Sequence, residues 1–449
     1  MIIGGLPTLH EPGIVAAGVG TQLAFLGDES EAALQPIVAT VEWDKTYYGT
    51  KSGEPLNAQR VLEGRQKELD NIAKFKVKQD ISLKEARARG LKIVYAKWLD
   101  DRKPMEGDPD LVRSRLVATE NNLYAREDCT QATPPRKVFR ILLSCAASNV
   151  APDGTRRRLI ARYDVKVAFF HADSDGKTVV VPPKEQREDG VGWLLLKAMH
   201  DTRTASKMFG NFVVDALVGV GHEQVQAAPM TLRHKSYDYS LSVHGDDFVA
   251  EGDAPGLDKL DVIMAQNFDV KRLPWIGPSE YGGETTSGQH LGCTISWTSE
   301  GFQWEGNIKN VEDLMELMQF DEKTKGAATP SCKETGKGVR SSLDELPARD
   351  ASYYRTCAGA LQYIAQDCLA IKQATCEVMG GMATPLRIHQ LRLVRVARYL
   401  KTYPGEKWHY CYQPTPTVVD EYCDSDWAWG IVTRRSVSCV VEKWVPARA

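Results

Sequence analysis

The chain has 449 residues, room for about two to four domains, and its 43% hydrophobic and 26% charged residues are typical of a globular protein. A net charge of -3 excludes a generally basic nucleic-acid coat, and the lack of any apolar run of about eighteen residues argues against a membrane-spanning helix. The ten cysteines include no C-x-x-C pair, which indicates neither a zinc site nor a disulfide framework and favours reduced thiols in an intracellular protein.

The first part of the chain is predicted to form a small mixed subdomain. Residues 1–44 show no clear periodicity and are expected to be a poorly ordered leader. Apolar residues at near-helical spacing after Asn57 predict an amphipathic helix over 57–75, with Asn57 as its N-cap. Two β-prone segments follow at 91–103 and 113–120, separated by the turn-forming sequence PMEGDPD.

The middle of the chain mixes helices and strands of unequal length. RKVFRILLSCAAS (136–148) predicts a buried helix, and residues 155–176 predict a strand that runs into a turn. A second helix is expected over 204–221, and a helix followed by a strand over 254–275. No regular βαβ rhythm appears, so the pattern favours an α+β fold over a doubly wound sheet.

The last third divides by composition. Residues 322–350 are polar and rich in glycine and lysine, which indicates a linker. Residues 351–410 have the periodicity of helices. Residues 411–449 contain two strand-like segments, EYCDSDWAWG and SVSCVVEKW.

Two adjacent carboxylates raise the first question of chemistry. In YSLSVHGDDFVAEGD the apolar residues alternate with a period of two, which predicts a hairpin with Asp246 and Asp247 at its tip. Gly-Asp-Asp is ordinary turn chemistry, because glycine accepts a positive φ and Asp bonds to its own backbone. The alternative is a site for divalent metal, and such a site needs a third carboxylate.

Asp164 of RYDVKVAFF is the candidate for that third ligand. Nucleotidyl transfer uses two divalent ions, one at the attacking hydroxyl and one at the leaving pyrophosphate. Mg²⁺ prefers hard oxygen ligands, and Mn²⁺ accepts the same ones. One Asp on a strand followed by an Asp-Asp hairpin is the arrangement found in the palm of right-hand polymerases. An isolated Asp at the end of a strand is more often a turn residue.

The order of nine sequence blocks resembles the reverse transcriptase of copia-type retrotransposons, in a divergent branch with His-Gly-Asp-Asp at the hairpin. The resemblance runs from about residue 45 to the C-terminus, from RSRLVATE (113–120) to YCDSDWAWGIVTRRSVS (422–438). It implies a right-hand polymerase fold. The implied divisions are fingers and palm at 45–275, a thumb-like region at 276–321, the linker at 322–350, a helical connection at 351–410 and a truncated RNase H-like fragment at 411–449.

The resemblance also implies roles for individual residues. Asp164, Asp246 and Asp247 match the family's metal-binding carboxylates. Phe169 falls where the family places an aromatic ring under the incoming sugar, which would select deoxynucleotides. Arg113 and Arg115 match a basic fingers strand that contacts the triphosphate, a task suited to guanidinium geometry. A core phenylalanine and exposed arginines are the purely structural alternatives.

Basic residues are grouped in two further stretches. One surrounds the strand of Asp164, and the other lies on the expected helix near residue 390. Such patches could follow the phosphate backbone of a template-primer, although a solvated helix face explains the second equally well. Their members are Arg156, Arg157, Arg158, Arg162 and Lys166 in the first patch, and His389, Arg392 and Arg395 in the second.

The C-terminal block resembles the first hairpin of the family's RNase H domain. Asp424 matches its first metal-binding position, and Asp426 follows two residues later. A working RNase H needs further acidic residues on later elements, and the sequence stops at Ala449. No RNase H activity is therefore expected.

Some positions depart from the family pattern. His200 and Asp201 in MHDTRTA replace an aromatic residue and a glycine, and an Asp side chain there would add bulk and repel phosphate. This leaves a catalytically inactive remnant of a retroelement, with residual nucleic-acid binding, as an alternative. An RNA-dependent RNA polymerase is a further alternative, which Phe169 disfavours.

The expected activity is therefore RNA-directed DNA polymerisation with two Mg²⁺ or Mn²⁺ ions. The expected partners are an RNA or DNA template-primer and deoxynucleoside triphosphates, without a membrane. Such a protein would work in the cytoplasm, within retroelement particles, or in the nucleus.

Overall fold

The computed structural model describes residues 38–42, 45–105, 107–120, 129, 131, 133–149, 151, 153–331, 344–425 and 438–445. Helices and mainly antiparallel sheets alternate irregularly along this part of the chain, so the predicted α+β class is confirmed. No helix in these ranges is both long and apolar enough to cross a membrane.

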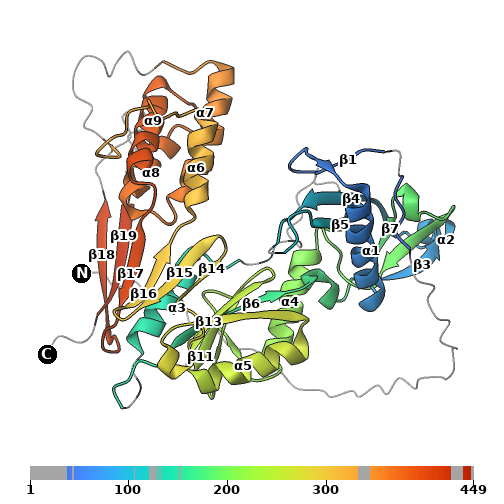
Figure 1. Cartoon of the computed structure of the whole chain (residues 1–449), viewed down its shortest axis with the longest axis horizontal. Coiled ribbons are helices and arrows are strands. Elements are labelled where there is room, and N and C mark those ends of the chain that lie inside the picture. Colours follow the sequence, from blue (N-terminus) through green and yellow to red (C-terminus); the bar gives the residue numbers. More distant parts are fainter. Residues whose placement is uncertain are drawn as a thin grey trace, which may run out of the picture.

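A six-stranded antiparallel sheet lies at the centre of the molecule (Figure 1), in the order β13-β6-β12-β11-β10-β9. Its strands are β6 (Leu159–Val165), β9 (Glu223–Gln224), β10 (Thr231–His234), β11 (Tyr239–His244), β12 (Asp247–Gly252) and β13 (Val270–Ile276). Helices α4 (Ala205–Val218) and α5 (Ala254–Asn267) contribute side chains to the core on one face, together with Tyr163, Phe248 and their neighbours. Helix α3 (Arg136–Ser148) covers part of the other face.

A second unit is built on a five-stranded sheet in the order β3-β8-β7-β4-β5. Its strands are β3 (Lys78–Ser82), β4 (Lys92–Arg102), β5 (Val112–Ala118), β7 (Thr178–Val181) and β8 (Val191–Leu195). Helix α1 (Ala58–Lys74) packs on β5, α2 (Leu83–Ala88) packs on β3 and β4, and β1 (Tyr47–Tyr48) pairs with β2 (Pro55–Leu56). Strand β4 pairs in parallel with β7 at its start and antiparallel with β5 afterwards, so its last residues project beyond β7.

A third unit contains a four-stranded sheet and a group of helices. The strands β14 (Ser287–His290), β15 (Cys293–Thr298), β16 (Gly301–Glu305) and β17 (Lys407–Cys411) pair in that order. The helical unit consists of α6 (Ile308–Leu317), α7 (Ala348–Ile364), α8 (Lys372–Met379) and α9 (Arg387–Thr402), which share one apolar core. Figure 1 shows the helical unit and the five-stranded unit on opposite sides of the central sheet.

The remaining strands, β18 (Val418–Ser425) and β19 (Ser438–Val445), pair only with each other among the described residues. Most side chains of β18 are exposed, including Val419 and Tyr422. The four-stranded sheet thus joins residues 287–305 to 407–411, and α6 packs with the helices after residue 347. The proposed divisions between 276 and 449 remain proposals, and these contacts cross them.

The local predictions are largely confirmed. Asn57 caps α1, where its side chain accepts a hydrogen bond from the Arg60 amide, and the helix predicted over 136–148 is α3 with the same bounds. Two observations bear on the expected leader and linker, whose bounds remain predictions. Ala39, in the predicted leader, is buried and its amide donates to Gln66, whereas residues 1–37, 43 and 44 lie outside the described residues. The start of the predicted linker runs along α9, with the Ala327 amide donating to the Arg398 carbonyl.

Candidate active site

The predicted hairpin is formed by β11 and β12, joined by Gly245 and Asp246. Gly245 has a φ of +63° and Asp246 does not have a positive φ, the pattern of a type II′ turn with glycine at its first central position. A side chain at residue 245 would therefore strain the backbone. The register pairs His244 with Asp247, so both project from the same face of the sheet.

Asp164 and Asp247 lie directly opposite each other on the neighbouring strands β6 and β12. The Val165 amide also donates to the Asp246 carbonyl at 2.9 Å, which ties the turn to the end of β6. The next pair along, Tyr163 and Phe248, is buried in the core under α4 and α5. Because side chains alternate along a strand, the two carboxylates point to the opposite face, beyond the end of α3. The intervening chain of about eighty residues is thus folded so that Asp164 pairs with Asp247 next to the turn that carries Asp246.

The three carboxylates repel one another. Burial raises the pKa of Asp247 to about 6, and the negative charges of Asp246 and Asp164 add to the increase. The folded protein therefore holds a proton on Asp247 more tightly than the unfolded chain does. A cation bound there would relieve this repulsion.

Two basic side chains, Lys103 just after β4 and Arg113 in β5, lie within electrostatic range of this cluster. Burial and the guanidinium groups of Arg113 and Arg115 lower the pKa of Lys103, whereas Asp164 and Asp246 raise it. Asp246 and Asp164 also act on the pKa of Arg113, which burial and Arg115 lower. Lys103 and Arg113, at the end of the β4–β5 hairpin, are thus electrostatically coupled to Asp164 and Asp246. Sequence reasoning did not identify Lys103, although its place beside two arginines on the paired strand was a signal.

Phe169 lies on a 3₁₀ helix, Ala168–His171, directly after β6. Its partly buried ring makes edge contacts with His200, at a centroid distance of 5.2 Å, and with Phe209 at 6.2 Å. The chain reaches this helix through Val167, whose φ of 45° and ψ of 43° are left-handed. A β-branched residue adopts that conformation only at a cost of roughly 1–2 kcal/mol, so surrounding contacts hold the turn. The neighbouring Phe170 instead packs into the core of the five-stranded unit.

His200 is held between Phe169 and Phe170, with centroid distances of 5.2 and 5.3 Å. Its carbonyl accepts a hydrogen bond from the Ala118 amide of β5, and its Nδ1 lies 3.9 Å from Glu68 Oε1. Burial, with the charges of Arg115 and Arg113, lowers the pKa of His200 to about 4, so the ring is neutral at physiological pH. Burial raises the pKa of Glu68 to about 7. His200 therefore acts as an uncharged packing partner beneath Phe169.

Asp201 occupies the position where a glycine was expected. Its φ is 62°, so the backbone has the left-handed conformation that glycine adopts most easily and that Asp tolerates better than most residues. The local chain path that the glycine would provide is therefore present. The side chain is exposed.

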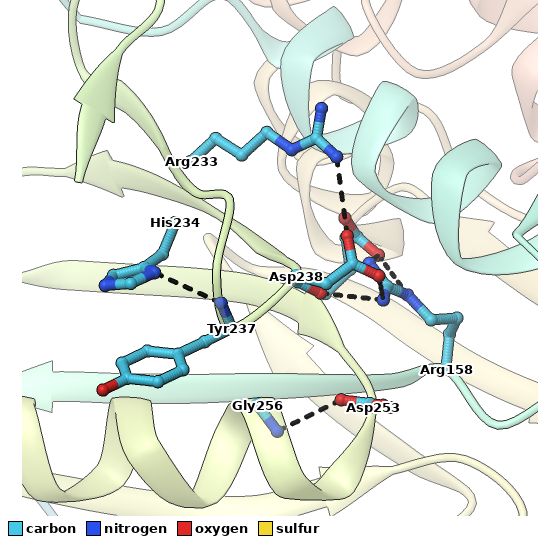
Figure 2. A network of polar contacts seen from close by, with 8 residues as sticks. Arg158, Arg233, His234, Tyr237, Asp238, Asp253 and Gly256 are labelled. Carbon is cyan, nitrogen blue, oxygen red and sulfur yellow. Dashed lines mark hydrogen bonds and ion pairs between the residues drawn. The ribbon is translucent and has the colours of Figure 1, made fainter. Parts of the chain in front are cut away.

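The first basic patch is largely occupied by contacts within the protein. Arg158 donates to Glu251 and to Asp238. Figure 2 shows the Asp238 carboxylate between Arg158 and Arg233, which also donates to it. Arg162 donates to the carbonyls of Gln289 and Pro274. The remaining members also have partners: Arg156 donates to two carbonyls, Arg157 pairs with Asp153, and Lys166 pairs with Asp269. These hydrogen bonds and ion pairs favour a structural role for the patch, in which the side chains of Arg157 and Lys166 remain 43% and 57% exposed.

The second patch, on α9, is also partnered. Arg395 donates to Thr329 at 2.8 Å, and the Arg392 guanidinium lies 3.7 Å from the carboxylate of Glu377. His389 accepts a hydrogen bond from the Leu386 amide at the start of the helix. These contacts favour the structural interpretation of the patch.

The predicted RNase H positions lie far from this site in sequence. Asp424 is exposed near the end of β18, opposite Cys439 of β19. Asp426 lies outside the described residues. The structure thus provides no test of a metal site at this hairpin.

The carboxylate cluster fits a divalent ion in its chemistry. Carboxylate oxygens are the ligands that Mg²⁺ and Mn²⁺ prefer, and burial, with the added charges of Asp246 and Asp164, raises the pKa of Asp247. The side chains do not converge on a single point: among the described residues no three Asp, Glu, His or Cys groups are arranged to hold one ion. The backbone register of Asp164 and Asp247, rather than their side-chain rotamers, therefore supports the site.

Comparisons with known proteins find similarity only among solved structures. The foamy viral protease-reverse transcriptase dRH in complex with ds DNA matches 82% of this chain and 51% of its own, with 12% identity and a TM-score of 0.36. The foamy viral protease-reverse transcriptase with dsDNA matches 91% and 70%, at 10% identity and 0.41. Telomerase from Candida albicans with a fragment of telomeric RNA matches 80% and 68%, at 10% identity and 0.35.

The structural similarity is to reverse transcriptases, at low identity. The chain spans about half the length of the first of these structures. No family model and no curated protein matches it, so the copia-type assignment has no support from the comparisons. TM-scores below 0.5 carry no argument about activity, and the function must be inferred from the geometry of this chain's own residues.

Proposed function

We propose that the chain is an RNA-directed DNA polymerase that transfers nucleotides at Asp164, Asp246 and Asp247, and that it derives from a copia-type retrotransposon. One observation carries the proposal. Asp164 and Asp247 lie opposite each other on paired strands with Asp246 in the adjoining turn, and Lys103 and Arg113 are electrostatically coupled to Asp164 and Asp246. A nucleoside triphosphate with divalent ions needs both kinds of charge within one site.

Each group of residues has a separate role in the proposed reaction. Asp164, Asp246 and Asp247 would hold two Mg²⁺ or Mn²⁺ ions, which polarise the attacking hydroxyl and neutralise the leaving pyrophosphate. Arg113, Arg115 and Lys103 would bind the triphosphate from the opposite side and balance its charge. Phe169, seated on His200, would lie under the sugar. RNA or DNA template-primer and deoxynucleoside triphosphates are the proposed substrates.

Primer extension tests this function directly. Purified protein on poly(rA)/oligo(dT), and on a DNA template, is expected to incorporate deoxynucleotides with Mg²⁺ or Mn²⁺. Incorporation should cease when EDTA removes the metal and return when the metal is restored, because the carboxylates cannot neutralise pyrophosphate alone. Absence of incorporation under all these conditions would leave the alternative, an inactive remnant with residual nucleic-acid binding.

Substitution of Arg113 tests the basic group. Arg113→Ala is expected to raise the KM for deoxynucleotides about tenfold and to change the template-primer Kd little, because a charge-assisted hydrogen bond to phosphate contributes about 1.5–3 kcal/mol. Steady-state kinetics at varied nucleotide concentration measure the KM, and fluorescence anisotropy with a labelled template-primer measures the Kd. Arg89→Ala, in an exposed arginine after α2, is the matched control and should leave KM unchanged. An unchanged KM in Arg113→Ala would remove Arg113 from the nucleotide site.

The inactive remnant is the second candidate, and Asp201 is the observation that bears on it. The negative charge of Asp201 would oppose the binding of a triphosphate. Its left-handed φ, however, gives the backbone the same conformation that a glycine at this position would adopt. The RNase H-like fragment at 411–449 likewise remains a proposal, supported by the β18–β19 hairpin that carries Asp424.

A further inference from the structure

A buried carboxylate joins the helical unit to the central part of the molecule. Asp367 lies between α7 and the short 3₁₀ helix Leu369–Ile371 and is 4% exposed. It forms an ion pair with Arg136, the first residue of α3, whose helix packs on the central sheet. The pair therefore spans two units whose contacting residues are about 230 positions apart in sequence.

Three strands of the four-stranded sheet also contact Asp367. The indole of Trp304 in β16 donates to Asp367 Oδ1 at 3.1 Å, and the Cys293 thiol of β15 lies 3.6 Å from Oδ2. The indole of Trp408 in β17 donates to the Asp367 carbonyl at 2.8 Å. Two strands of the four-stranded sheet thus reach the Asp367 side chain and a third reaches its backbone, so one residue holds the helical unit, this sheet and α3 in a fixed relation.

The packing around Asp367 leaves no room for adjustment. Gly306, in the loop between β16 and α6, is so close that a Cβ there would lie 2.8 Å from the Cβ of Asp367. Any side chain at residue 306 would have to displace Asp367. Glycine is therefore required here by close approach rather than by a left-handed backbone.

The same guanidinium orients an exposed aromatic ring. Arg136 also donates to the hydroxyl of Tyr363 on α7, and its guanidinium carbon lies 4.4 Å from the centre of that ring. Tyr363 is 46% exposed. Next to Arg136 on α3, Phe139 contacts His244, which directly precedes the Gly245-Asp246-Asp247 turn, at a centroid distance of 6.2 Å. The contact between Asp367 and Arg136, called the joint below, thus lies between the exposed Tyr363 of the helical unit and the hairpin that carries Asp246 and Asp247.

We propose that Asp367 is a positioning residue, which with Arg136 fixes the angle between the helical unit and the central sheet and thereby sets the affinity for template-primer. The second half of this inference rests on the proposed function. Removal of the Asp367 charge leaves the partly buried Arg136 guanidinium without a counter-charge. This is strongly destabilising, so we expect the two units to separate at this contact. Exposed aromatics such as Tyr363 are the groups on which bases stack, and their placement changes when the joint opens.

The test compares two carboxylate-to-amide variants. Asp367→Asn breaks the pair across the joint, and Glu251→Gln breaks the equally buried Arg158–Glu251 pair inside the central sheet. Small-angle X-ray scattering of the full chain reports the arrangement of the units, and fluorescence anisotropy with a labelled template-primer gives Kd at fixed salt. Both variants are expected to have a lowered Tm.

Only Asp367→Asn is expected to change the scattering profile and to raise the template-primer Kd about tenfold, with the deoxynucleotide KM within about twofold of the original. Gly306→Ala should act in the same direction without removing a charge, and Asp367→Glu should restore part of the affinity. Equal effects of Glu251→Gln, or an unchanged profile and Kd in Asp367→Asn, would overturn the proposal. If the unmutated chain binds no template-primer, the proposed function fails, whereas the scattering comparison still decides the role of the joint.

Discussion

Asp247→Asn is expected to reduce primer extension by about a thousandfold or more while making the metal-free protein more stable. The loss follows because an amide cannot replace a charged ligand of the catalytic ions, and about 4 kcal/mol of transition-state stabilisation corresponds to that factor. The gain follows because Asn removes one of three mutually repelling carboxylates. Initial rates at saturating nucleotide and urea unfolding without divalent ions measure the two effects.

The pH dependence of stability shows whether the charge on Asp247 stabilises or destabilises the folded protein. The pKa of Asp247 is about 6 in the folded protein against 3.8 for the free side chain, so the folded state binds the proton more tightly. Stability from this group is fully present below pH 4 and is lost as pH rises to about 6. Above that pH, Asp247→Asn should be more stable by about 1–2 kcal/mol, after allowance for solvent screening. Mg²⁺ should stabilise the unmutated protein and have little effect on this variant.

Asp269 provides the matched control, because its pKa is lowered in the folded protein whereas that of Asp247 is raised. A hydrogen bond from Lys74 lowers its pKa, and Lys166 adds to the effect, so its charge stabilises the fold at neutral pH and loses that contribution as pH falls through the lowered value. Asp269→Asn should therefore reduce stability at neutral pH and retain polymerisation. If Asp247→Asn is the less stable of the two at pH 7.5 without metal, the repulsion among the three carboxylates is not what determines its effect.

Phe169→Val is expected to admit ribonucleotides, with an increase of about a hundredfold in ribonucleotide relative to deoxynucleotide incorporation. The aromatic ring is wedged against His200 and Phe209 and would exclude a 2′-hydroxyl by volume. A well-packed pocket distinguishes substrates that differ by one small group by about that factor. The ratio of kcat/KM for ATP and dATP on a poly(dT) template measures it.

Phe170 is the matched control for sugar selection. It follows Phe169 directly but is fully buried and packs with Phe75 in the core of the five-stranded unit. Phe170→Leu should lower Tm and leave the sugar ratio unchanged. Equal ratios in the unmutated protein and in Phe169→Val would assign sugar selection to another residue, and efficient ribonucleotide use by the unmutated protein would revive the RNA polymerase alternative.

Local features of the fold were predictable because they depend on neighbouring residues. The Asn57 cap needs only the amides that follow it, and the α1 spacing needs only the helical period. The hairpin of β11 and β12 follows from strict alternation around a glycine that accepts a positive φ. The partners of the basic stretch beside Asp164 were not predictable, since charge in the sequence does not reveal whether an arginine such as Arg158 has a buried partner.

By itself, then, the sequence determined the strands, the helices and the turn that carries Asp246 and Asp247. Only the tertiary structure decided which strands pair: β6 lies beside β12, so Asp164 stands opposite Asp247. It also decided that Lys103 is electrostatically coupled to Asp164 and Asp246 and that Asp367 forms an ion pair with Arg136. The spacing of apolar residues within one helix or strand is a local property of the sequence. Pairing of strands that are eighty or more residues apart depends on which faces bury apolar surface together. The free energy of that burial depends on all the packed elements at once.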